Sequence, residues 1–113
     1  MSSAPWLESD VSLKALNTFG LPATARRLAR IRGDADVRRV LDSPEVGRSA
    51  KLVLGGGSNL VLTRDVDEVV LKVEVDGLRL VETRDDAFIV EAGAGMTWHD
   101  VVRQTIACGW PGL

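Results

Sequence analysis

The stretch Lys51-Leu-Val-Leu-Gly-Gly-Gly-Ser-Asn59 runs from a short apolar segment directly into three consecutive glycines. Leu52 to Leu54 have the composition of a buried strand, and Ser58 and Asn59 close the loop that follows. Three glycines remove three side chains from one place, so backbone N–H groups can approach a bulky anion such as phosphate or pyrophosphate. An ordinary turn needs only one or two glycines. The stretch therefore predicts a strand that ends in an anion-binding loop, while a glycine-rich turn without a ligand stays open.

The residues after the glycines argue against two familiar phosphate loops. A Walker A loop ends in Gly-Lys-Ser/Thr, whereas Ser58-Asn59 follows here and no lysine is present. A dinucleotide fingerprint needs a third glycine and a helix directly after it, but Leu60 stands where that glycine belongs and residues 60–63 lead into another strand. We expect a strand–loop–strand cradle in which backbone amides, the Ser58 hydroxyl and the Asn59 amide hold the anion.

The segments around this loop predict a βαβ-like first half. We expect a flexible lead-in over residues 1–15, then a strand over residues 25–31. An aspartate at position 34 or 36 can cap a short helix that ends before Ser43-Pro44. Residues 51–54 form the strand that leads into the glycine loop, so the first subdomain, which holds this loop, would cover residues 16–65.

The second half, residues 66–113, predicts the start of an antiparallel subdomain. Apolar residues alternate over 69–75, and Asp76-Gly77 is a strong hairpin signal, so we expect a three-stranded meander that ends near Glu91. A second glycine loop, Ala92-Gly-Ala-Gly95, follows. Thr97 should cap a helix over residues 98–108, with Gly109 just beyond its end.

The composition is that of a small soluble domain with no sign of nucleic-acid or membrane binding. The 113 residues are 45% hydrophobic and 27% charged, with a net charge of −2. Four arginines gather between Arg26 and Arg32, but aspartates follow at once, so we expect them on the solvated face of an edge strand. No apolar run reaches the ~20 residues of a membrane span. A single cysteine, Cys108, suits a reducing cytoplasm.

Four motifs in order resemble those of the UDP-N-acetylenolpyruvoylglucosamine reductase family, also called UDP-N-acetylmuramate dehydrogenases. Each motif alone is weak, but their order and spacing together are specific. The resemblance runs from about Leu13 to the end of the chain. The motifs are Asn17-Thr-Phe-Gly20, Gly55-Gly-Gly-Ser-Asn59, Ala92-Gly-Ala-Gly95 with Trp98-His99, and Gly109-x-Pro111-Gly-Leu113.

The resemblance implies an α+β, FAD-binding fold of the vanillyl-alcohol-oxidase (PCMH) type, of which this chain holds an incomplete part. It implies that Gly55, Gly56, Gly57, Ser58 and Asn59 bind the FAD pyrophosphate, and that Thr18, Gly93, Ala94 and Gly95 also contact the cofactor. Some members of the superfamily attach FAD through a histidine in the phosphate loop. This loop has none, and His99 at the predicted helix start is expected to pack or cap, so non-covalent FAD is expected.

The family reaction reduces the enolpyruvyl double bond of UDP-N-acetylglucosamine-enolpyruvate, with NADPH as hydride donor, in peptidoglycan precursor synthesis. A proton donor and groups that stabilise the enolate complete it. In the family these catalytic residues and the UDP-sugar site lie C-terminal to the position of Leu113. We therefore assign no catalytic residue and no metal ligand, and expect the chain alone to be inactive. Two alternatives remain: another FAD-dependent oxidoreductase of the same fold, and a nonenzymatic nucleotide- or anion-binding module.

Overall fold

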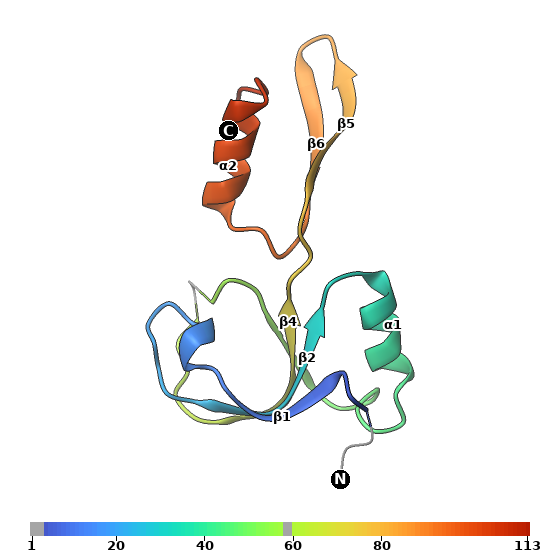
Figure 1. Ribbon diagram of the computed structural model, residues 1–113, viewed down its shortest axis with the longest axis vertical. Helices are drawn as coiled ribbons and strands as arrows, with labels where there is room; N and C mark the ends of the chain where they lie inside the picture. Colours follow the sequence, from blue (N-terminus) through green and yellow to red (C-terminus); the bar gives the residue numbers. More distant parts are fainter. Residues whose placement is uncertain (1–3, 58–59) are drawn as a thin grey trace. The chain divides into compact units, whose positions relative to one another are not determined.

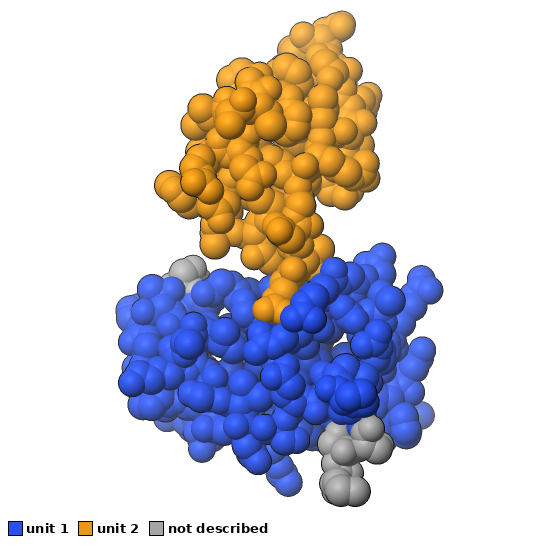
Figure 2. All heavy atoms as spheres, in the orientation of Figure 1, with its two compact units in different colours: residues 1–73 blue, residues 74–113 orange. Residues whose placement is uncertain are grey.

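The computed structural model describes residues 4–57 and 60–113. The chain divides into two compact units, one ending at Val73 and the other beginning at Glu74 (Figure 2). We expected the division between residues 65 and 66. The structure divides the chain later because the strand that ends at Val73 pairs with strands that precede it.

The first unit is built on a four-stranded mixed sheet in the order β1-β2-β4-β3 (Figure 1). β2 and β3 both run parallel to β4, which lies between them, and β1 adds to the other side of β2 in the antiparallel sense. The predicted strands at 25–31 and 51–54 and the predicted helix are confirmed. The elements of this unit are β1 (Leu7–Ser12), the 3-10 turn η1 (Lys14–Leu16), β2 (Thr24–Ile31), α1 (Asp34–Asp42), β3 (Lys51–Leu54) and β4 (Val66–Val73).

The expected flexible lead-in over residues 1–15 is wrong, because β1 forms there and pairs with β2 from Leu7 to Ser12. Leu7 is buried, and Leu13 is only 1% exposed. β1 also makes β2 an interior strand, so the arginines do not lie on an edge strand. Arg30 pairs instead with Glu8 of β1, with 2.9 Å between Nε and Oε2.

The expected three-stranded meander is also wrong, because β4 joins the first sheet rather than a hairpin. Val69 and Val70 are neighbours in sequence and both fully buried, which an alternating, half-exposed strand would not allow. A central parallel strand is covered on both faces, so consecutive apolar residues suit it. The Asp76-Gly77 pair therefore does not form a hairpin turn between β4 and the strand that follows.

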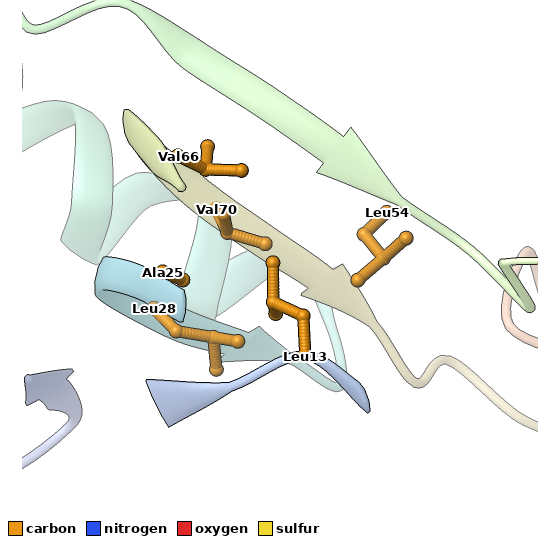
Figure 3. Close-up of a cluster of buried hydrophobic side chains, with 6 residues drawn as sticks. All are labelled: Leu13, Ala25, Leu28, Leu54, Val66 and Val70. Atoms are coloured by element: carbon orange, nitrogen blue, oxygen red, sulfur yellow. The ribbon is translucent and has the colours of Figure 1, made fainter. Parts of the chain in front are cut away.

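One buried cluster of the first unit lies on one face of this sheet (Figure 3). Leu13 points from the end of β1 toward Val70, and the side chains of β2, β3 and β4 close around it. Burying an aliphatic side chain of this kind contributes about 1.5–3 kcal/mol relative to exposure. The cluster consists of Leu13, Ala25, Leu28, Leu54, Val66 and Val70, with Val11, Leu16, Leu52, Leu60 and Leu62 packed against it.

The second unit contains a β-hairpin and one helix. β5 (Leu78–Arg84) and β6 (Ala87–Ala92) pair through the predicted turn at Asp85-Asp86. α2 (Trp98–Ala107) begins where predicted: the Thr97 hydroxyl accepts a hydrogen bond from the Asp100 N–H at 3.2 Å.

The end of α2 also follows the prediction. Gly109 has φ +74°, and the N–H groups of Gly109 and Trp110 donate to the carbonyls of Ile106 and Thr105. This is the Schellman pattern, in which a left-handed residue satisfies the last carbonyls of a helix. Within the described residues, no helix is long and apolar enough to cross a membrane.

Candidate functional site

The glycine loop begins where β3 ends, at the edge of the sheet to which the carboxyl ends of the parallel strands point. Gly55 directly follows Leu54, and the chain then runs through Leu60 and Leu62 into β4 without a helix in residues 60–65. The predicted strand–loop–strand context is confirmed. Ligands of open parallel sheets bind outside the carboxyl ends of the strands. The loop therefore occupies the side of the sheet where a ligand is expected.

The three glycines of this loop differ in whether the fold leaves room for a side chain. Gly57 is buried, has φ +73°, and a Cβ there would clash with the backbone carbonyl of Leu16. A Cβ at Gly55 or Gly56 would meet nothing within 4 Å in the part of the chain that the structure describes. The fold thus requires glycine only at position 57. At positions 55 and 56 the missing side chains leave open space beside exposed backbone, as a ligand-binding loop needs.

A tight turn around Asn17 supports the loop. Asn17 is 7% exposed, and its Nδ2 donates to the carbonyls of Leu13 and Leu21 at 2.7 and 3.2 Å. Its Oδ1 accepts the Leu21 N–H at 2.9 Å. This turn also holds the glycine loop, because the Thr18 N–H donates to the Gly57 carbonyl at 3.1 Å. The Asn17-Thr-Phe-Gly20 and glycine motifs, separate in sequence, are therefore joined in the structure.

A lysine from the neighbouring strand holds the other end of the loop. Lys72 lies opposite Leu54 in the β3–β4 register, and its Nζ donates to the Gly55 carbonyl at 2.6 Å. Among the described residues, both hydrogen bonds that fix the loop use carbonyl oxygens, those of Gly55 and Gly57. These two contacts use no backbone N–H group of the loop, as a loop that binds an anion through its N–H groups requires. Ser58 and Asn59 lie outside the described residues.

Sequence reasoning missed Lys72, because it looked for a lysine within the loop. The signal that would have found it is the parallel register, which places a residue near the end of β4 beside the end of β3. That register cannot be read before β4 is assigned to the first sheet.

The second glycine loop has a packing reason for its glycines within the second unit. A Cβ at Gly93 would clash with the backbone of Val75 and Asp76, and one at Gly95 would lie 2.7 Å from the Val75 nitrogen. Both N–H groups are engaged, with Gly93 donating to Gly77 and Gly95 to Val75, each at 2.8 Å. Gly93, Ala94 and Gly95 stay a prediction as cofactor residues.

His99 does not have the packing or capping role that we expected. It is exposed in the first turn of α2, and the cap comes from Thr97.

The sequence comparisons agree with one another. The model of the FAD binding domain family matches residues 25–113. The chain is 57% identical over 119 residues to the UDP-N-acetylenolpyruvoylglucosamine reductase of Azoarcus sp. strain BH72, covering all of this chain and 34% of that relative. It is 50% identical over 111 residues to the protein of the same name from Burkholderia ambifaria strain MC40-6, covering 98% of this chain and 32% of the relative. The chain spans about one third of the length of these curated relatives.

A solved structure has a similar fold. The crystal structure of UDP-N-acetylenolpyruvylglucosamine reductase (MurB) from Thermus caldophilus matches with a TM-score of 0.66 at 25% sequence identity. The match covers 95% of this chain and 35% of that one.

Proposed function

The chain belongs to the FAD binding domain family, and we propose that it is the FAD-binding part of a UDP-N-acetylenolpyruvoylglucosamine reductase. The identity of 57% to the Azoarcus relative extends over the whole chain and supports this assignment. One observation carries the location of the cofactor: Gly55 and Gly56 lack side chains for which the fold has room.

In this proposal the glycine loop holds the diphosphate of FAD without a covalent bond. The N–H groups of residues 55–57 donate to phosphate oxygens, with the Ser58 hydroxyl and the Asn59 amide beside them. Thr18 is exposed and contacts the cofactor from the turn that Asn17 orders. Gly93, Ala94 and Gly95 are further proposed cofactor residues. None of these residues exchanges a proton with substrate.

FAD, when bound, supplies the hydride chemistry that no side chain can perform. For the whole protein we propose NADPH as hydride donor and the enolpyruvyl group of a UDP-sugar as acceptor, in cytoplasmic peptidoglycan precursor synthesis that serves cell shape and division. The residues of this chain bind and orient. We assign no proton-transferring residue to this chain, so the chain alone should not oxidise NADPH in the presence of substrate.

Titration of the chain with FAD, followed by the change in flavin fluorescence, tests the cofactor assignment. Gly56→Val places two methyl groups beside the exposed backbone, so we expect FAD affinity to fall by about tenfold or more. The melting temperature should stay close to that of the unchanged chain, because position 56 faces open space. Equal FAD affinity in the variant, with the fold intact, would rule out the glycine loop as the diphosphate site.

A chimera tests the activity. Replacing the matching third of the Azoarcus reductase with this chain should give an enzyme that oxidises NADPH when UDP-N-acetylglucosamine-enolpyruvate is present. The same chimera with Gly56→Val is the control and should lose flavin and activity together. A chimera that folds and holds FAD but shows no substrate-dependent oxidation would contradict the proposed reaction.

A further inference from the structure

Lys72 is a positively charged group held against the glycine loop by the register of the sheet. Its Cα lies opposite that of Leu54 on β3 and that of Arg30 on β2. The charge of Arg30 faces Glu8, at 2.9 Å. Among the described residues, the Lys72 ammonium group has no carboxylate within ion-pair distance, and its one hydrogen bond goes to the Gly55 carbonyl at 2.6 Å.

Because of the geometry of the peptide bond, the contact between Lys72 and the Gly55 carbonyl fixes the direction of the Gly56 N–H. A trans peptide is planar, so the carbonyl of one residue and the N–H of the next point in opposite directions. An ammonium group that binds the Gly55 carbonyl therefore directs the Gly56 N–H away from Lys72. Gly56 is the exposed member of the triplet, and none of residues 4–57 and 60–113 lies within 4 Å of the space where its Cβ would be.

The charge of the Lys72 ammonium group also makes the Gly56 N–H a stronger hydrogen-bond donor. A hydrogen bond from an ionised donor is about twice as strong as a neutral one, and it polarises the peptide to which it is made. Withdrawal of electron density toward the Gly55 oxygen makes the Gly56 N–H a better donor to an anion. A side chain without a hydrogen-bond donor at position 72 would supply neither the orientation nor the polarisation.

We propose that Lys72 is a positioning residue of the diphosphate site: by holding the Gly55 carbonyl, it aims the Gly56 N–H at a phosphate oxygen of the cofactor. The inference rests on the proposed function, because it needs a diphosphate at the loop. A Walker loop carries its lysine within the loop. Lys72 lies on the adjacent strand instead, and it acts on the phosphate through the Gly55–Gly56 peptide.

Lys51 offers a matched control. It lies on β3, is half-buried, and its Nζ donates to the carbonyls of Gly47 and Ser49 at 2.8 Å each. Lys51→Met therefore removes the same charge and the same kind of contact from the same sheet, but from a different loop.

The test measures FAD affinity by fluorescence titration for the unchanged chain, Lys72→Met, Lys72→Arg and Lys51→Met. We expect Lys72→Met to weaken FAD binding by about tenfold to hundredfold, the usual range for a charged hydrogen bond. Lys72→Arg should recover most of the loss, and Lys51→Met should stay within about twofold of the unchanged chain. Melting temperatures confirm that each variant is folded.

A second measurement reports on the Gly55–Gly56 peptide directly. Inorganic pyrophosphate added to ¹⁵N-labelled chain should shift the Gly56 amide resonance downfield, and Lys72→Met should abolish that shift while Lys51→Met preserves it. Full FAD affinity in folded Lys72→Met, or an equal loss in Lys51→Met, overturns the inference and leaves the proposed function standing. If the unchanged chain binds neither FAD nor pyrophosphate, the proposed function fails and this inference fails with it.

Discussion

Within Gly55-Gly-Gly57, one backbone angle separates a residue that the fold needs from two that it does not. Gly57 has a positive φ and touches the Leu16 carbonyl, whereas Gly55 and Gly56 have neither constraint. Sequence alone showed three equal glycines and assigned all of them to the ligand. The distinction requires coordinates, because it depends on a carbonyl some forty residues earlier in the chain.

Gly57→Ala should destabilise the fold by on the order of 3 kcal/mol, because the new side chain meets both left-handed strain and a backbone clash. Gly55→Ala should change the free energy of unfolding by less than about 0.5 kcal/mol. Urea denaturation followed by circular dichroism compares the two. Equal stability of the two variants would show that the close approach of Gly57 to Leu16 does not exist in solution.

At the scale of elements, β4 is the part that sequence reasoning placed in the wrong sheet. The pattern from Val69 to Val75 fits an alternating strand, and Asp76-Gly77 fits a hairpin, so local signals agreed on the wrong partner. The consecutive pair Val69-Val70 carried the opposite signal. α2 was predicted well because its start and end depend on the neighbouring residues Thr97 and Gly109. The helix expected after Arg32 also forms, but α1 begins after Gly33 and has no side-chain cap, so the expected aspartate N-cap is wrong.

The position of β4 predicts a sharp contrast between two valines of the same sheet. Val70 is fully buried, and Val70→Ala should lower the free energy of unfolding by on the order of 2 kcal/mol. Val53 of β3 is 67% exposed, and Val53→Ala should cost less than about 0.5 kcal/mol. Chemical denaturation of both variants measures the difference. Similar losses would mean that β4 is not the central strand.

At the scale of the whole molecule, the α+β FAD-binding fold expected from the four motifs is confirmed by the family match and the structural likeness. The order of the motifs was enough to identify that fold. It was not enough to place β1, because residues 7–12 carry no motif and little hydrophobic pattern. Only pairing with β2 makes that segment a strand, and pairing is a property of the folded chain.

The two units should differ in local stability. The first unit contains nearly all the fully buried side chains, while β5 is exposed along almost its whole length. A two-stranded hairpin is marginally stable by itself. Amide hydrogen exchange should therefore be at least about a hundredfold slower in β2 and β4 than in β5 and β6. Uniform protection across both units would contradict this expectation.

The strand order β1-β2-β4-β3 also has a consequence during synthesis. Among the strands that the structure describes, β3 pairs with β4 alone, and β4 comes later in the chain. Until the ribosome has released the residues up to Val73, β3 has no strand to join and the loop after it has no fixed shape. Contacts between distant segments slow folding. During synthesis there is therefore a stage in which β1 and β2 can pair while the apolar β3 is exposed and unpaired. In that stage β3 can bind chaperones or aggregate.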